Sequence, residues 1–197
     1  MRRIYEILIV LILIILLAGC RQGVTTIKTA ELTESEKELL SSVGAERYFV
    51  FDVDLSHMDF LRLEYRVDYY EKGKLVGQVT DGATSGHSSE KKQERLIWSQ
   101  IKSGGNQDEI WVISFAGSRM TQRVSLSEQI RGMSWSQNEM IGTVNPGEEI
   151  TLAAIVGTES GDLPGIIFDR KEGIQSLKEY DVAYVLTVSF HEDPAAQ

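Results

Sequence analysis

The sequence predicts a mainly β protein: an antiparallel β-sandwich with a short N-terminal helix. Two observations support this fold class. About eight short segments have strand-like patterns: in most of them apolar residues alternate with polar ones, as in strands with one face in a core, and two are apolar on both faces. These segments follow one another at short spacing without amphipathic helices between them, which disfavours a parallel α/β sheet.

Residues 1–19 have the composition of a signal peptide. The basic pair Arg2-Arg3 precedes an apolar run from Ile7 to Leu17, which is shorter than the ~20 residues that a transmembrane helix needs. The run closes with Leu17-Ala18-Gly19-Cys20. This motif resembles the lipobox of bacterial lipoproteins. The resemblance implies cleavage before Cys20 and attachment to its sulfur of a lipid with fatty acids such as palmitate.

The lipobox resemblance also implies a location, the extracytoplasmic face of the cell membrane, and leaves open whether that membrane is the plasma or the outer membrane. Cys20 is the only cysteine, so lipidation leaves no thiol for a disulfide or a cysteine metal site. A formal net charge of -9 without a basic block disfavours nucleic acid as a partner. The expected partners are the membrane, through the lipid on Cys20, and an envelope protein or glycan.

Residues 20–32 are expected to form the lipidated cysteine and a polar tether, and residues 33–197 a single β-rich domain. Thr33-Glu34-Ser35-Glu36 has the capping-box arrangement, a hydroxyl at the N-cap with a carboxylate three residues later. We therefore predict a short helix whose apolar stripe packs on the domain, because so short a helix is not stable alone. The residues of this stripe are Leu39, Leu40 and Val43.

The pattern of apolar residues after residue 44 predicts the positions of the strands. Two late segments, residues 150–156 and 182–190, are apolar on both faces and are predicted to be central strands. Residues 174–179 can form one helical turn, and residues 81–92 are expected to be a polar loop. The other predicted strands cover residues 49–55, 61–69, 75–80, 95–101, 109–117 and 119–126, with a tight turn at residues 71–74.

One strand segment carries a second resemblance. Asp181-Val182-Ala183-Tyr184-Val185-Leu186 resembles the D-x-A-x-Y-x-C strand of immunoglobulin-like domains, with Leu186 at the position of the cysteine. The resemblance covers six residues and implies an immunoglobulin-like topology.

Two polar segments contain residue types found in metal or catalytic sites. Residues 52–59 open like a calcium loop, but His57 replaces the required glycine and Leu63 the required glutamate, which indicates the solvent face of a strand. Residues 81–89 contain Ser85 and His87, yet a catalytic triad needs groups that converge from fixed elements. We expect a solvated connection there, with His87 as a ligand contact.

The three histidines, His57, His87 and His191, lack the spacing of zinc ligands. We therefore expect neither a metal nor a cofactor.

The tryptophans divide into two kinds. Trp111 alternates with Ile113 and Phe115, which predicts a place in the core. Trp135 lies in the polar stretch 132–138, where two interpretations stay open: a stacking platform for sugar or peptide, or a plug that closes one end of the sandwich.

These observations together predict a non-enzymatic, lipid-anchored binding or interaction module of the bacterial cell envelope, with Trp135 and His87 as candidate ligand contacts. The alternative is a cell-envelope hydrolase with a carboxylate pair that the sequence does not single out. Two buried carboxylates facing one cleft would favour the hydrolase.

Overall fold

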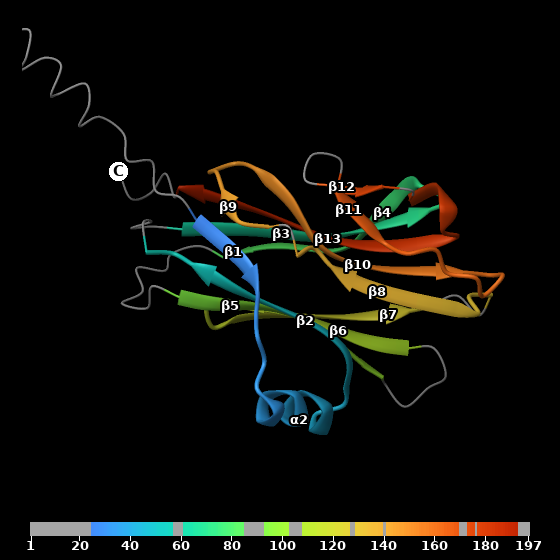
Figure 1. The fold of residues 1–197 in the computed structure, drawn as a ribbon, viewed down its shortest axis with the longest axis horizontal. Helices are drawn as coiled ribbons and strands as arrows, with labels where there is room; N and C mark the ends of the chain where they lie inside the picture. Colours follow the sequence, from blue (N-terminus) through green and yellow to red (C-terminus); the bar gives the residue numbers. More distant parts are fainter. Residues whose placement is uncertain are drawn as a thin grey trace, which may run out of the picture.

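The computed structural model confirms the mainly β fold: two antiparallel sheets face each other as a sandwich (Figure 1). It describes residues 25–56, 61–84, 93–102, 108–126, 129–139, 141–169, 173–175 and 177–192. The first sheet has the strand order β7-β6-β5-β2-β1-β9, and the second has the order β4-β3-β13-β10-β8. Within the described part of the chain, no helix has the length and hydropathy that crossing a bilayer requires.

The strands of the first sheet are β1 (Thr25–Thr29), β2 (Ala45–Asp54), β5 (Gln93–Lys102), β6 (Asp108–Phe115), β7 (Ser118–Ser125) and β9 (Thr143–Val144). Those of the second are β3 (Leu61–Glu71), β4 (Lys74–Thr84), β8 (Gly132–Gln137), β10 (Glu149–Thr158) and β13 (Val182–Glu192). The smaller elements are α2 (Glu34–Ser42), the hairpin of β11 (Ile167–Asp169) and β12 (Gly173–Gln175), and the 3-10 turn η1 (Leu177–Glu179).

Aromatic rings fill the space between the two sheets. Trp98 and Trp111 of the first sheet contact each other, with ring centroids 5.5 Å apart. Trp111 also meets Tyr184 of the second sheet edge-on at 4.9 Å, and Tyr184 stacks on Tyr69 at 5.1 Å. Such pairs add to the free energy of burying the rings themselves. The predicted core position of Trp111 is confirmed, since the residue is buried.

β10 and β13 are central strands, as predicted, because each lies between two others. Their double-sided apolar pattern has a physical reason. One face lines the core between the sheets, and the other is covered by the chain between β10 and β13. In this second, smaller core Ala154 and Val185 pack against Phe168 and Ile174.

The expected tether is wrong in its second half, because Thr25–Thr29 is strand β1. β1 lies between β2 and β9 and places Ile27 in the core, fully buried. The sequence pattern missed it because Ile27 is the one large apolar residue among threonines. Threonine nevertheless favours strands, since its β-branched side chain packs well on a pleated surface.

Two further segments differ from the sequence expectation. Residues 81–84, expected in a loop, continue strand β4, and residues 85–92 lie outside the described part. Gly132–Gln137 forms the edge strand β8, which the sequence did not reveal because none of its side chains is buried. Of the helical turn predicted at residues 174–179, only residues 177–179 form a turn, η1; residues 174 and 175 belong to strand β12 instead.

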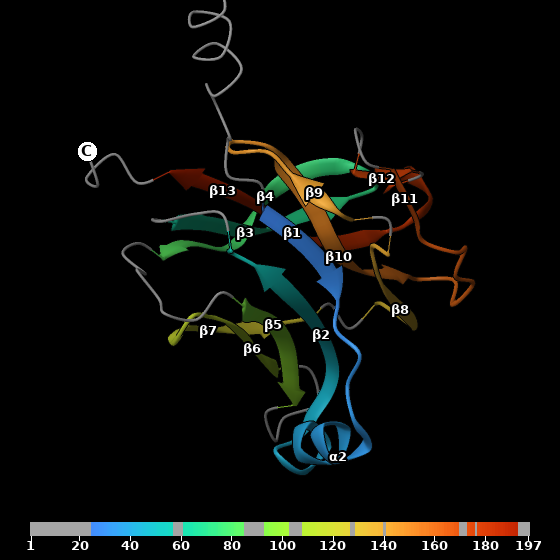
Figure 2. The ribbon, with the colours of Figure 1, turned by 60° about the vertical axis from the view of Figure 1, so that its left-hand side comes forward.

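Helix α2 begins as predicted. The side chain of Thr33 caps the helix, and Oε2 of Glu36 accepts a hydrogen bond from the backbone N–H of Thr33 at 2.8 Å. The predicted packing is wrong for most of the stripe: Leu39 and the C-cap residue Val43 are exposed, Leu40 is half-buried, and no residue of α2 is fully buried. In both ribbon views α2 projects from the sandwich, on the side toward which β1 points (Figures 1 and 2).

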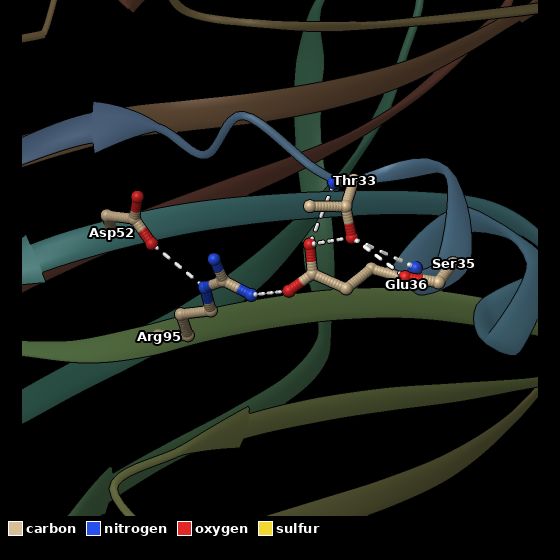
Figure 3. Close-up of polar contacts among 5 residues, drawn as sticks. All are labelled: Thr33, Ser35, Glu36, Asp52 and Arg95. Carbon is tan, nitrogen blue, oxygen red and sulfur yellow. Dashed lines mark hydrogen bonds and ion pairs between the residues drawn. The ribbon is translucent and has the colours of Figure 1, made fainter.

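Polar contacts hold α2 in place instead (Figure 3). Arg95 on β5 donates to Glu36, and its Nε donates to Asp52 on β2 at 2.9 Å. The hydrogen bonds from Arg95 and then from Thr33 lower the pKa of Glu36 to about 2 from an ordinary value of 4.5. Since the folded-state pKa is the lower one, this contribution to stability is present above pH 4.5 and is lost as the pH falls toward 2.

The position of Ile27 predicts that β1 is part of the folded domain. Ile27→Ala should lower the free energy of unfolding by about 2–5 kcal/mol, because it leaves a cavity in the core. Lys28→Ala, on the exposed face of the same strand, should change it by less than about 0.5 kcal/mol. Urea unfolding followed by circular dichroism measures both. Equal effects of the two substitutions would mean that β1 does not contribute to the core.

Candidate functional site

Trp135 is the best-supported of the predicted contact residues. It lies on β8, the edge strand of the second sheet, and its exposed fraction is 49%. A tryptophan that is half exposed does not close a core, so the interpretation of Trp135 as a plug is wrong. Its exposed indole surface is free to form a stacking contact.

Arg47 holds Trp135 from the opposite sheet. It comes from β2, and its guanidinium carbon lies 5.3 Å from the centroid of the Trp135 ring. Its Nη2 also approaches the sulfur of Met133, which lies on β8 as well, at 3.9 Å. Such a cation–π contact is worth about 0.5–2 kcal/mol, the larger value applying where the cation is desolvated. The Arg47 side chain is desolvated to that extent, being only 12% exposed.

A buried carboxylate fixes the guanidinium group of Arg47. Its Nη1 donates to Oε1 of Glu109 on β6 at 2.8 Å and to Oε1 of Gln100 on β5 at 2.9 Å. The second oxygen of Glu109 accepts from Nε1 of Trp111 at 2.8 Å. A polar chain therefore runs from Trp111 in the core through Glu109 and Arg47 to the exposed Trp135. The buried Glu109 also affects Tyr184: burial, and then the negative charge of Glu109, raises the pKa of Tyr184 to about 12.

An open groove of about 660 Å³ borders Trp135 at this end of the sandwich. Lys102 and Glu46 form an ion pair in its wall, with 2.9 Å between Nζ and Oε1. We call it the Trp135 groove; its lining consists of Ser41, Gly44, Ala45, Glu46, Arg47, Lys102 and Trp135. It combines an exposed aromatic surface with a paired cation and carboxylate.

A family comparison fits this domain. The model of the YgaN domain matches residues 26–190, a range that begins in β1 and contains every residue of the Trp135 groove. The chain belongs to the YgaN domain family. No curated protein and no solved structure matches the chain. The YgaN domain thus includes β1, which the sequence analysis placed in the tether.

Most of the other candidate residues lie where the structure describes nothing. His57, Ser85 and His87 lie outside the described residues. Asp52 binds Arg95 on the surface of the first sheet, as expected of a strand's solvent face. Among the residues that the structure describes, no group of three or more histidine, cysteine, aspartate or glutamate residues is arranged to hold a metal ion.

A second hollow, of about 320 Å³, lies over β3, β4 and β13 and contains a serine near a histidine. Ser189 Oγ lies 2.9 Å from Nε2 of His191, and Glu64 approaches the same Nε2 at 3.5 Å. A catalytic triad uses the two ring nitrogens separately, one for the nucleophile and one for the carboxylate. This geometry therefore does not favour a hydrolase.

The buried carboxylates do not favour a hydrolase either. Asp68 on β3 is paired with Arg66 at 2.9 Å, and Glu109 on β6 is paired with Arg47. They belong to different sheets and pair with different arginines; Arg66, the partner of Asp68, also pairs with Glu149. A glycosidase pair instead requires two carboxyl groups on either side of one bond.

The sequence analysis missed Arg47, Gln100, Glu109 and Lys102. The sequence did contain one signal for Glu109. It is two residues before Trp111 and four before Ile113, so it lies on the same, inward-facing side of the strand. A charged residue in that position needs a buried partner. Arg47 had no such signal, because its contacts depend on which strands become neighbours.

The buried ion pair leads to a stability prediction. Arg47→Ala should lower the free energy of unfolding by about 3–5 kcal/mol, because Glu109 then stays buried without its cation. Combining Arg47→Met with Glu109→Gln should restore most of this loss, since glutamine still accepts from Trp111. Arg62→Ala, which breaks an exposed pair with Glu64, should cost only about 0–1 kcal/mol. Urea denaturation measures all three; an Arg47→Ala effect no larger than that of Arg62→Ala would contradict the buried-pair interpretation.

Proposed function

We propose that this protein is a lipid-anchored, extracytoplasmic binding module of the bacterial cell envelope that contacts its partner through the Trp135 groove. The observation that carries the proposal is the half-exposed Trp135, held on the buried Arg47–Glu109 pair. Exposed aromatic residues that are fixed in place lose little entropy on binding and often supply much of the binding energy.

The lipobox resemblance supports the anchored part of the proposal. Cys20 lies five residues before Thr25, so a lipid on Cys20 would keep the start of β1 within ~18 Å of the membrane surface. With a net charge of -9, the protein gains nothing from anionic head groups, and the acyl chains would supply the attachment. The immunoglobulin-like resemblance of residues 181–186 concerns the fold alone and adds no binding residue.

The direction of the strands supports a groove that faces away from the anchor. Thr26 on β1 pairs with Asp54 at the end of β2, whereas Ala45, at the start of β2, lines the groove. Nine residue steps of strand separate Ala45 from Asp54, roughly 30 Å along the strand. An anchor before Thr25 would therefore present the groove to partners in the envelope instead of to lipid.

The anchor predicts a loss of lipid labelling. Cys20→Ala removes the thiol that the lipobox resemblance marks for modification, and no other cysteine can replace it. Metabolic labelling with a fatty-acid probe should mark the wild-type protein and not the variant, and the variant should leave the membrane fraction. Undiminished labelling of the Cys20→Ala protein would contradict the lipoprotein assignment.

The groove predicts that Trp135→Ala reduces binding strongly and the stability of the fold only modestly. Trp135→Ala should weaken binding by about 2 kcal/mol or more, roughly thirtyfold, since an aromatic anchor is removed. The probes are purified peptidoglycan sacculi and, separately, solubilised envelope proteins. Loss of the cation–π contact with Arg47 should lower the free energy of unfolding by no more than about 2 kcal/mol, whereas Trp98→Ala, a buried control, should lower it by about 3–5 kcal/mol. If neither probe distinguishes Trp135→Ala from wild type, the groove is not the binding site.

A further inference from the structure

β8 is an edge strand without the usual protection against the addition of another strand. Proteins protect exposed edges with charged side chains, with bulges or by keeping the strand short. The other edge strands of the two large sheets have such features: β7 carries two arginines, β9 has two residues, and the register of β4 with β3 shifts twice. The six residues of β8 include no charge and no proline, and their register with β10 is unbroken. β8 is therefore the edge best suited to pair with another extended chain.

The hydrogen bonds between β8 and β10 show which backbone groups of β8 are left at its free edge. The N–H of Asn138 donates to the carbonyl oxygen of Leu152 at 2.7 Å. In an antiparallel pair, residues that bond to the neighbouring strand alternate with residues whose N–H and C=O face away from it. Continued from Asn138, this alternation turns three backbones of β8 to the free edge: those of Met133, Trp135 and Gln137. Within the described part of the chain, no further segment bonds to them, so they form a row of donors and acceptors that matches an extended backbone.

The charges beside β8 give its edge a direction. Arg131 precedes the strand, Glu139 follows it, and both are exposed. A strand that runs antiparallel to β8 begins beside Glu139 and ends beside Arg131. Its best complement is therefore a basic residue near its N-terminal end and an acidic residue near its C-terminal end, because opposite charges on neighbouring strands attract.

Trp135 lies at the middle of this free edge. Its side chain faces the first sheet, as does that of Ile155, the residue opposite it on β10. On an added strand, the residue opposite Trp135 would lie on the same face with its Cα roughly 5.5 Å away, which suits an apolar side chain. We infer that the partner is an extended segment of a protein that adds to β8 as an antiparallel strand, with an apolar residue against Trp135 and charges complementary to Arg131 and Glu139. The inference rests on the proposed function, whose partner class it names.

Other occupants fit this edge less well. A glycan has no row of amide donors and acceptors, and a helical segment uses its own internally. A second copy would pair its β8 with this one through a two-fold axis that reverses the direction of the strands. Because the start of β1 and the groove lie at opposite ends of β2, one of two such copies would turn its groove toward the membrane.

The first test uses the lipidated protein in nanodiscs of zwitterionic lipid, with empty nanodiscs as the blank. The probe is a fluorescent peptide, Lys-Thr-Val-Thr-Val-Thr-Val-Thr-Glu, whose length matches residues 131–139 and whose valines come opposite the three free backbones. One comparison peptide has N-methyl groups on the three valines, and the other has them on three threonines. In the inferred register the valine N–H groups face β8, whereas the threonine N–H groups face solvent.

Fluorescence anisotropy should show binding of the unmethylated peptide. Methylation of the valines should weaken this binding by about tenfold or more, because three main-chain hydrogen bonds are lost, whereas methylation of the threonines should change it less than about threefold. Trp135→Ala should also weaken it several-fold, since the apolar contact is removed. Equal effects of the two methylations, or no binding of the unmethylated peptide to the wild-type protein, would overturn the inference.

A charge exchange tests the direction of the added strand. The wild-type protein should bind the lysine-first peptide several-fold more tightly than a peptide whose two charged ends are exchanged. Arg131→Glu with Glu139→Arg keeps the net charge of the protein and should reverse this preference. Lys74→Glu with Asp81→Lys, an equivalent exchange on the edge strand β4, should leave the preference as in wild type. A preference that the exchange beside β8 does not reverse would overturn the inference.

Crosslinking tests the second copy as an occupant. Two chains with different tags are co-expressed, one with Ser134→Cys and the other with Ser136→Cys. In a two-fold pair centred on Trp135 these cysteines would lie opposite each other, with their Cα atoms roughly 4.5 Å apart, close enough for a disulfide. Little crosslinking between the two tags is expected. Crosslinking of most chains would mean that β8 pairs with itself, which overturns the inference.

The partner class and the proposed function fail separately. If Trp135→Ala weakens the binding of sacculi or envelope proteins but valine methylation leaves peptide binding unchanged, the partner class is wrong and the binding module stands. If valine methylation abolishes peptide binding but Trp135→Ala weakens the binding of no probe, β8 adds a strand and the Trp135 groove is not the binding site. Loss of peptide binding on both changes supports both.

Discussion

The edge-on contact between Trp111 and Tyr184 joins the two sheets, and the other features of the domain depend on it. The rings lie 4.9 Å apart, so the sheets meet through aromatic surfaces. The same tryptophan donates its Nε1 hydrogen to Glu109. One side chain thus completes the core with its ring and begins, with its nitrogen, the polar chain that leads to the surface.

That polar chain explains how the domain tolerates a carboxylate in its interior. A buried carboxylate without partners costs several kcal/mol, and Glu109 avoids this because Trp111 and Arg47 donate to its two oxygens. The same hydrogen bonds hold the Arg47 guanidinium in place, and it lies against one face of the Trp135 ring. The Trp135 ring is therefore held in one position, which would reduce the entropy lost in the binding that we propose.

The alternation of apolar residues predicted the sandwich because most strands have one buried face, as β6 does. It failed for β1, which has Ile27 as its single large apolar residue, and for β8, which buries no side chain. The site was less predictable than the fold. Glu109 carried a local signal, an inward-facing charge, but the contact of Arg47 with Trp135 exists only because β2 and β8 meet at one end of the sandwich.

In helix α2, too, the feature set by neighbouring residues was predictable and the feature set by distant residues was not. Its start follows from Thr33 and Glu36, three residues apart, and was predictable; its packing depends on a distant partner, Arg95, and was not. A helix of nine residues is marginal in isolation, so α2 persists because β1 and β2 hold its two ends and Arg95 holds Glu36. The exposed side chains of Leu39, and of Val43 at the C-cap, therefore contribute little to the burial that holds the helix.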